Sequence, residues 1–329
     1  MINQFSVYKK NIANFKYQLG FDNLVDFNLE NLKNNNFDCL VFVGMGGSGL
    51  VGDIISEILP EINLNIPVIT WKDYDLPNLP YQNPFYFFVS FSGNTEETLS
   101  GLKKLQIKNN QNLAIISSDG EMKNLAMDNK IPFVEFNPSS LTPRQASLIM
   151  TYASLKIISV LFPQITLPSV GKINLKKLEI QAKAIALKLQ NKLIYIYSDF
   201  QNKNLAYFLK IKINETAKSP AFINYLPELD HNEIVGFENK KFNSAVVFIE
   251  SNLSKNLSKK FKITQKFLKK FKVNIVTINL KEKDKFNKII KMLLLADLIA
   301  YYLAKFYGVD PIETKIISEM KSLSKRYKN

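Results

Sequence analysis

The residues best suited to chemistry in this chain begin with a glycine-rich segment, GMGGSG at residues 44–49. It follows an apolar run and precedes an amphipathic one. Glycines let a backbone approach an anion closely, and a helix start offers N–H groups and the positive end of its dipole. The same letters satisfy the dinucleotide pattern Gly-x-Gly-x-x-Gly, with Asp73 where a ribose ligand is expected. This segment alone leaves three interpretations open: a dinucleotide site, a sugar-phosphate site, or a tight structural turn.

A second segment, SFSGNTEE at residues 90–97, also follows an apolar run and starts a helical pattern. Asn94 and Glu97 have the spacing of a capping box, so helix capping explains part of it. Capping leaves the hydroxyls of Ser90, Ser92 and Thr95 without a role. Hydroxyls and backbone N–H groups suit a terminal phosphate, which presents several acceptor oxygens, whereas a dinucleotide needs only the first loop. The two segments together favour a sugar phosphate.

Composition singles out the residues that differ from a lysine-rich background. The formal net charge is +14, yet only Arg144 and Arg326 are arginines and His231 is the single histidine. Nucleic-acid readers favour arginine forks with stacking aromatics, so scattered lysine argues against that class and indicates a field that attracts small anions. In such a chain an arginine or a histidine is expected to do what lysine cannot.

These residues must be positioned by helices and strands. Short apolar runs alternate with longer amphipathic ones, a pattern that predicts βαβ units. Strands are predicted at residues 39–43, 67–71, 85–90, 113–117, 132–136, 193–197, 245–249 and 273–278. Helices are predicted near residues 4–32, 50–59, 95–107, 121–128, 143–161, 175–189, 202–214, 255–271 and in the closing segment. Ligands of such open sheets bind at the carboxyl ends of the strands, where both loops lie.

The length of 329 residues exceeds what one hydrophobic core supports, so two domains are expected. Residues 162–172 contain Pro163, Pro168 and Gly171 and read as a linker. We therefore expect an α/β fold of two doubly wound subdomains, at residues 1–162 and 163–329, each a mainly parallel sheet flanked by helices. Residues 292–304 are apolar but too few to span a bilayer and predict a buried helix.

The sequence resembles a known family. The two loops, in this order, resemble the sugar isomerase (SIS) domain. NETAKSPA at residues 214–221, PELDHNE at 227–233 and GVDP at 308–311 resemble the bifunctional phosphoglucose/phosphomannose isomerase family. The matches run in order over most of the chain. The resemblance implies two SIS-type subdomains that interconvert glucose 6-phosphate, fructose 6-phosphate and also mannose 6-phosphate through a cis-enediolate.

The resemblance also implies roles for individual residues. Glu215 would be the base that moves the proton, although capping or an ion pair with Lys212 or Lys218 would also explain a glutamate there. Arg144 would stabilise the enediolate, which suits a permanently charged donor fork. The phosphate would be bound by residues of the two loops: Gly46, Gly47, Ser48, Ser90, Ser92 and Thr95.

The resemblance implies three further roles, for residues in the second half of the chain. His231 would open the sugar ring in the site of the neighbouring subunit of a homodimer, since imidazole both accepts and donates a proton near neutral pH. Lys321, with Lys315 as its competitor on the final helix, would assist. Thr314 stands where conventional phosphoglucose isomerases have glutamine, which favours added mannose 6-phosphate activity.

No metal or cofactor is expected, because one histidine and one cysteine cannot form a zinc cluster. A non-catalytic phosphosugar sensor and an NAD(P)-dependent dehydrogenase are the alternatives. A sensor would not require Glu215, Arg144 and His231 together. A dehydrogenase would have no use for the hydroxyls of the second loop. Without a targeting signal, and with Cys39 as the single cysteine, we expect a cytoplasmic protein without nucleic-acid or membrane partners.

Overall fold

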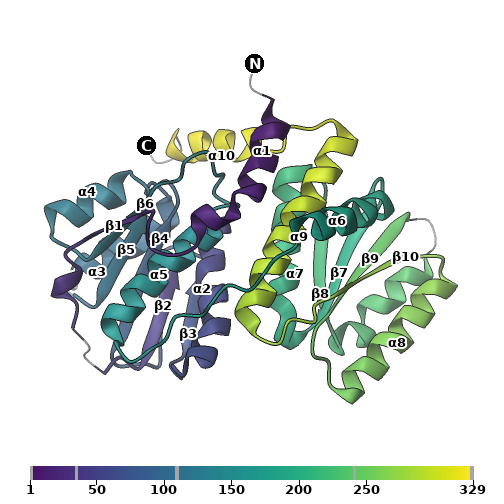
Figure 1. Cartoon of the computed structure of the whole chain (residues 1–329), viewed down its shortest axis with the longest axis horizontal. Helices are drawn as coiled ribbons and strands as arrows, with labels where there is room; N and C mark the ends of the chain where they lie inside the picture. Colours follow the sequence, from purple (N-terminus) through teal and green to yellow (C-terminus); the bar gives the residue numbers. More distant parts are fainter. Residues whose placement is uncertain (1–2, 34–35, 108–110, 240–241, 327–329) are drawn as a thin grey trace. The chain divides into compact units, whose positions relative to one another are not determined.

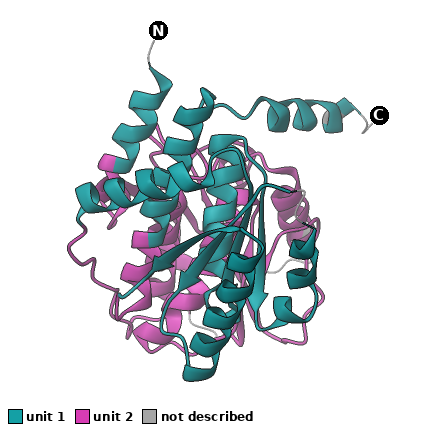
Figure 2. Cartoon of the chain, turned by 90° about the vertical axis from the view of Figure 1, so that its right-hand side faces the viewer, with its two compact units in different colours: residues 1–12, 174–281, 292–329 teal, residues 13–173, 282–291 magenta. Residues whose placement is uncertain are grey.

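The protein is described by a computed structural model over residues 3–33, 36–107, 111–239 and 242–326 (Figure 1). It divides into two compact units (Figure 2). Unit 1 comprises residues 1–12, 174–281 and 292–329, and unit 2 comprises residues 13–173 and 282–291. Both are layered α/β structures, and the predicted fold class is confirmed.

Strands and helices alternate along most of the chain. The strands are β1 Leu24–Phe27, β2 Cys39–Val43, β3 Val68–Trp71, β4 Pro84–Ser90, β5 Leu113–Ser117, β6 Phe133–Phe136, β7 Leu193–Asp199, β8 Ala221–Leu226, β9 Ser244–Glu250 and β10 Asn274–Asn279. The α-helices are α1 Gln4–Ala13, α2 Gly46–Ile58, α3 Glu96–Ile107, α4 Glu121–Asp128, α5 Ser147–Leu161, α6 Leu175–Leu189, α7 Lys203–Ala217, α8 Lys255–Lys270, α9 Lys285–Tyr307 and α10 Lys315–Arg326.

Unit 2 is built on a six-stranded sheet in the order β1-β6-β5-β4-β2-β3. Only β1 runs antiparallel to its neighbour. Every residue of β2 is buried, as expected for a strand of a parallel sheet that helices cover on both faces. Because β2 pairs with both β3 and β4, the strand order reverses there, and a crevice is expected at the carboxyl ends of β2 and β4.

Unit 1 contains a four-stranded parallel sheet in the order β10-β9-β7-β8. Here β7 pairs with both β8 and β9, so the corresponding reversal lies between β7 and β9. The core on one side of this sheet gathers around Tyr197, Leu229 and Phe248, which are fully buried. Helix α8 begins at an N-cap, where the hydroxyl of Ser254 accepts from the amide of Leu257 at 3.3 Å.

Two segments group differently from the halves that the sequence suggested. Residues 1–12 group with the C-terminal half and residues 282–291 with the N-terminal half. The Tyr8 hydroxyl donates to Asp297 at 2.7 Å, and the Glu61 carboxylate accepts from the amide of Lys285 at 2.6 Å. These are contacts between residues far apart in the sequence, which local patterns do not reveal.

Two strands were not predicted. The expected helical lead-in at residues 4–32 is wrong beyond α1, because β1 pairs antiparallel with β6. Strand β8, which lies at the edge of its sheet, is flanked by Pro220 and Pro227. Proline is tolerated beside an edge strand but obscures it in the sequence. The expected linker, residues 162–172, lies between α5 and α6, where the chain contains no helix or strand.

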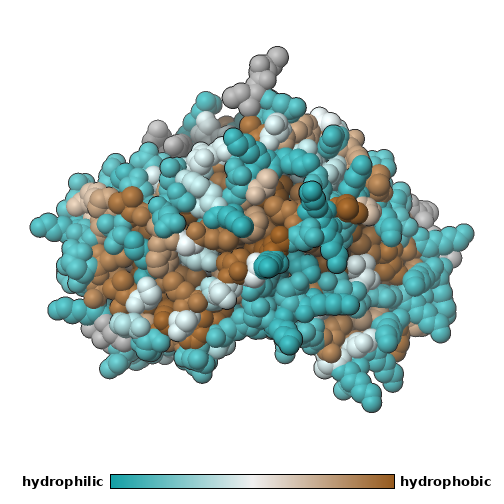
Figure 3. Space-filling view, viewed as in Figure 1, coloured by the Kyte–Doolittle hydropathy of each residue, from teal (hydrophilic) through white to brown (hydrophobic). Residues whose placement is uncertain are grey.

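Helix α9 contains the apolar stretch that the sequence assigned to a buried helix, and residues 292–296 are all buried. Within the described part of the chain, no helix is long and apolar enough to cross a membrane. Polar side chains cover much of the face shown in Figure 3, including the part over α8, where seven of 16 residues are lysines.

Candidate active site

The glycine-rich segment of unit 2, residues 44–49, joins the end of β2 to α2, which begins at Gly46 and not at residue 50 as the sequence predicted. The third glycine of the segment makes a close backbone contact. A Cβ on Gly47 would lie 2.4 Å from the carbonyl oxygen of Pro143 and 2.9 Å from the Cα of Arg144. Only glycine leaves room for that approach. The loop is therefore packed against the segment that carries the one arginine expected in the site.

Arg144 is 1% exposed and lies on a turn just before α5, not on the helix itself. The sequence placed the helix start at Pro143. The structure delays it to Ser147, because the amides of Gln145 and Ala146 both donate to the Thr142 carbonyl in a turn. The Ser147 hydroxyl donates to the carbonyl of Gly47 at 3.4 Å. The turn thus holds Arg144 beside the glycine-rich loop.

The second loop of unit 2 follows β4 and is organised by its own hydroxyls. The hydroxyls of Ser90 and Thr95 are hydrogen-bonded at 2.9 Å, and the amide of Gly93 donates to Ser90 Oγ at 3.1 Å. Gly93 has φ +66°, and a Cβ there would lie 1.7 Å from the carbonyl oxygen of Asp119. Ser90 is buried, Thr95 is half-buried and Ser92 is exposed, so Ser92 is the most accessible of the three hydroxyls.

Asn94 does not make the capping contact that its spacing suggested. Its side-chain oxygen accepts from the amide of Glu121 at 2.9 Å, at the start of α4. Its side-chain amide donates to the carbonyl of Ser92 at 3.1 Å. Asn94 therefore braces the loop against the next helix, a role that depends on a tertiary contact.

The two loops are joined to each other. Ser48 Oγ accepts from the amide of Phe91 at 3.0 Å, and its own proton is directed at the sulfur of Met150, 3.6 Å away. The sequence singled out Ser48 but missed Phe91, since a main-chain amide carries no sequence signal. The carboxyl ends of β2 and β4 thus bring glycine amides and hydroxyls together, next to the backbone segment that carries Arg144. Amides and hydroxyls are donors suited to an anion.

The corresponding crevice of unit 1 has a different character. Asp199, at the end of β7, is 2% exposed, and the Asn202 side chain donates to its carboxylate at 2.5 Å and to the Ser251 carbonyl at 3.1 Å. A buried carboxylate in place of a glycine-rich turn disfavours a phosphate there. Of the two sheets, that of unit 2 is the one equipped for an anion.

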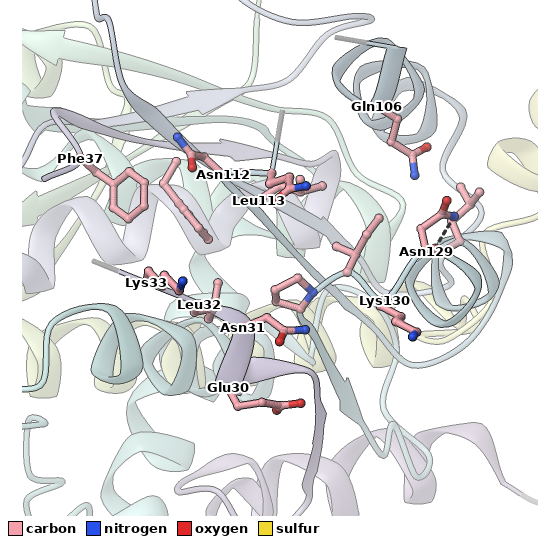
Figure 4. Close-up of a pocket in the computed structure, with 15 residues that line it drawn as sticks. Glu30, Asn31, Leu32, Lys33, Phe37, Gln106, Asn112, Leu113, Asn129 and Lys130 are labelled. Atoms are coloured by element: carbon pink, nitrogen blue, oxygen red, sulfur yellow. Dashed lines mark hydrogen bonds between the residues drawn. The ribbon is translucent and has the colours of Figure 1, made fainter. Parts of the chain in front are cut away.

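A large hollow of about 1080 Å³ also lies in unit 2, lined in part by Phe37, Asn112, Leu113 and Lys130 (Figure 4). Phe37 precedes β2, and Leu113 is the first residue of β5. The hollow is therefore at the amino ends of the strands, opposite the edge where the two loops lie. Its position differs from that of ligand sites in open α/β sheets.

Glu215 belongs to unit 1, in the last turn of α7, and is half-buried. On neighbouring positions of the same helix, the Thr216 hydroxyl is hydrogen-bonded to Tyr8 at 3.0 Å and the Lys212 ammonium lies 2.8 Å from the Asp297 carboxylate. The Lys218 ammonium donates to the Glu215 carbonyl at 2.5 Å. The last turn of α7 is thus held to other elements of unit 1.

The remaining candidates of unit 1 lie at its surface. His231 is exposed at the end of the short 3₁₀-helix Glu228–His231. Thr314 immediately precedes α10, and both Lys315 and Lys321 are exposed on that helix, Lys315 being 3.6 Å from the Glu313 carboxylate. The candidate residues therefore form two sets. The phosphate loops and Arg144 belong to unit 2, and the remaining candidates belong to unit 1: Glu215, His231, Thr314 and Lys321. Among the residues described, no cluster of three or more His, Cys, Asp or Glu side chains is arranged to hold a metal.

The chain is similar to known proteins in sequence and, separately, in fold. Residues 178–323 match the family model described as the bacterial phospho-glucose isomerase C-terminal SIS domain. The chain is 30% identical to the bifunctional phosphoglucose/phosphomannose isomerase of Aquifex aeolicus, over 88% of this chain and 91% of that protein. It is 28% identical to the enzyme of the same name from Thermoplasma volcanium, over 95% and 98%.

A solved structure extends the likeness to the fold. The C-terminal domain of glucosamine-fructose-6-phosphate aminotransferase from Francisella tularensis superposes with a TM-score of 0.66 at 14% identity, over 94% of this chain and 96% of that one. At such low identity the likeness concerns the fold alone, whereas the sequence matches extend over nearly the whole chain. The chain belongs to the bifunctional phosphoglucose/phosphomannose isomerase family.

Proposed function

We propose that this protein interconverts glucose 6-phosphate and fructose 6-phosphate, and also forms mannose 6-phosphate, by moving one proton between C2 and C1 of the open-chain sugar. Family membership supports the reaction class. The observation that carries the proposal is the joined pair of loops in unit 2, where Ser48 accepts from the Phe91 amide beside the buried Arg144. Phosphate binding there would position the substrate without taking part in bond-making.

In the proposed site the substrate phosphate is bound by the amides of Gly46 and Gly47 and by hydroxyls of the two loops. The exposed Ser92 and the half-buried Thr95 are the most accessible of these hydroxyls. Ser48 can turn its proton from the weak sulfur acceptor of Met150 to a phosphate oxygen while it still accepts from Phe91. A phosphate would then replace a weak contact with a charge-assisted one.

The chemical steps are assigned from the family resemblance. His231 and Lys321 open the ring by moving a proton between the ring oxygen and O1, with His231 supplied by the second subunit of a homodimer. The Glu215 carboxylate then takes the proton from C2, which leaves a cis-enediolate with its charge on two adjacent oxygens. Arg144 stabilises these oxygens, and Glu215 returns the proton to C1 to complete the ketose.

Mannose 6-phosphate follows from the same intermediate, because a proton delivered to the opposite face of C2 gives the epimeric aldose. Thr314, smaller than the glutamine of conventional phosphoglucose isomerases, would leave room for the altered arrangement at C2. We propose further that the enzyme works in the cytoplasm, where sugar phosphates are metabolised and a lone buried thiol such as Cys39 stays reduced.

The decisive experiment follows fructose 6-phosphate in D₂O by NMR with purified full-length protein. The wild-type enzyme is expected to form both aldose phosphates with deuterium at C2. Glu215→Gln should abolish deuterium incorporation, while glucitol 6-phosphate, which cannot isomerise, still binds with nearly unchanged affinity.

Glu238→Gln, which alters an exposed glutamate of the same unit, serves as the control and should behave as wild type. Wild-type-like exchange by the Glu215→Gln variant would remove the proposed base. A wild-type protein that binds glucitol 6-phosphate but turns over none of the three sugar phosphates would instead be a phosphosugar sensor.

A further inference from the structure

The loop that carries His231 is irregular, yet its flanking residues are fixed to the body of unit 1. Two short 3₁₀-helices, Glu228–His231 and Glu233–Glu238, follow β8 with Asn232 between them. Such short pieces do not hold a side chain in place through their own backbone bonds. His231 itself is exposed, so its position depends on its neighbours.

On the N-terminal side of His231, two residues fasten the loop. Leu229 is 0% exposed and belongs to the core cluster beneath the sheet. The carboxylate of Asp230 accepts from the hydroxyl of Thr264 on α8 at 2.8 Å, and Thr264 is itself 2% exposed. The residue immediately before His231 is therefore attached to a helical residue 34 positions later in the chain.

On the C-terminal side, the carboxylate of Glu233 is bound by two strands. Its Oε1 accepts from the Tyr197 hydroxyl of β7 at 2.5 Å, and its Oε2 accepts from the side-chain amide of Asn224 on β8. Tyr197 is 0% exposed. Burial, together with the hydrogen bond to Glu233, raises the pKa of Tyr197 well above its ordinary value, so the hydroxyl keeps its proton and remains the donor.

The residues on both sides of His231 are thus held by side chains of β7, β8 and α8. We infer that Tyr197, Glu233 and Thr264 are positioning residues that hold His231 in the orientation in which it opens the sugar ring. This inference rests on the proposed function, and in particular on the role of His231. It adds residues that act through the histidine and do not touch the substrate.

Loss of this positioning should slow ring opening but not the later proton transfer. Loss of an anchor would let the imidazole of His231 shift from its position. A shift of about 1 Å lowers the rate of catalysis by up to about 100-fold. Proton transfer by Glu215 on a sugar that is already open needs no ring opening. Anchor variants should therefore slow the reaction of cyclic substrates and spare that of an open-chain one, a separation that general destabilisation does not produce.

The test uses two substrates and the full-length enzyme. Fructose 6-phosphate is mainly a cyclic furanose, whereas 5-deoxyfructose 6-phosphate lacks the O5 hydroxyl that closes this ring and stays open. Deuterium exchange at C1 in D₂O reports Glu215 chemistry for both. The variants are Tyr197→Phe and Thr264→Val, with His231→Asn as the reference. Tyr195→Phe, the same chemical change two residues earlier on β7, is the matched control.

His231→Asn should lower kcat for fructose 6-phosphate by about 100-fold. Tyr197→Phe and Thr264→Val should each lower it by roughly tenfold, with exchange of the open-chain analogue within about twofold of wild type. Tyr195→Phe should match wild type on both substrates.

The inference is wrong if the anchor variants match wild type on fructose 6-phosphate while His231→Asn is slow, or if they slow both substrates equally. The two anchors are on different elements, so failure of one variant to fold leaves the other to decide. A wild-type enzyme that exchanges neither substrate would overturn the proposed function instead, and a wild-type-like His231→Asn would remove the role of the histidine.

Discussion

Ser48 Oγ accepts a hydrogen bond from the main-chain amide of Phe91 at 3.0 Å. The two residues are 43 positions apart: Ser48 is in the first turn of α2, which follows β2, and Phe91 directly follows β4, at the reversal of strand order in unit 2. This contact joins the two segments that we propose bind the substrate phosphate. It also makes Ser48 a structural member of the site as well as a candidate phosphate ligand.

Replacing this hydroxyl should weaken substrate binding more than it weakens the fold. For Ser48→Ala we expect KM for fructose 6-phosphate to rise about tenfold, the effect of one lost hydrogen bond of about 1.4 kcal/mol, with little change in kcat. Steady-state kinetics measure both constants. Ser56→Ala, which removes a hydroxyl from the same helix that donates to the Asp53 carbonyl, should leave KM unchanged. Equal KM values for the two variants would exclude Ser48 from binding.

Gly93 cannot be replaced without moving the second loop. Gly93→Ala would put a Cβ 1.7 Å from the Asp119 carbonyl oxygen at φ +66°, and we expect a loss of roughly 2–4 kcal/mol in the free energy of unfolding. Gly236→Ala is the control, because a Cβ there meets nothing within 4 Å. Urea denaturation of both variants compares the two. Similar midpoints would show that the loop accommodates the methyl group.

The buried pair of Lys212 and Asp297 should make a large contribution to the stability of unit 1. Their side chains are 1% and 9% exposed, and Tyr8 also donates to the carboxylate. Asp297→Asn should cost about 3–5 kcal/mol, because it leaves a buried ammonium without its counter-charge. Asp75→Asn breaks an exposed pair with Lys104 and should cost less than about 1 kcal/mol. Chemical denaturation measures the free energy of unfolding of both variants. Similar losses in the two variants would contradict this expectation.

Cys39 should be inert in the folded protein at ordinary pH. Burial, with a smaller effect of Asp38, raises the pKa of the Cys39 thiol to about 11, so the reactive thiolate is scarce at pH 8. Iodoacetamide should label the folded protein far more slowly than the urea-unfolded one. Mass spectrometry follows the label, and equal rates in the two states would show that the thiol is accessible.

The same thiol affects stability at alkaline pH with a definite sign. The folded state keeps its proton up to about pH 11, while the unfolded state loses it from its lower, ordinary pKa onward. The free energy of unfolding should therefore fall as pH rises through this window, and below it the thiol should have no effect. The free energy of unfolding of Cys39→Ala should decline less steeply over the same pH range. Parallel stability curves for the two proteins would contradict the shifted pKa.

Much of the chemistry was determined by the sequence alone, because it depends on local patterns. Glycines 46 and 47, the hydroxyls of the second loop, a buried β2 and the apolar stretch of α9 are all visible as residue types at fixed spacing. They predict the parallel α/β fold, and they also predict an anion site at the ends of two strands. The rarity of arginine and histidine pointed to Arg144 and His231 for the same local reason.

The tertiary structure decided what depends on contacts between distant residues. Strands β1 and β8 exist through pairing with β6 and β7, and Asn94 braces α4 in place of the cap that its spacing suggested. The approach of Arg144 to Gly47, the tie from Ser48 to Phe91 and the anchors of the His231 loop are likewise non-local. A sequence pattern records which groups are available along the chain. Which of them meet is determined only when the sheet brings separate loops to one edge.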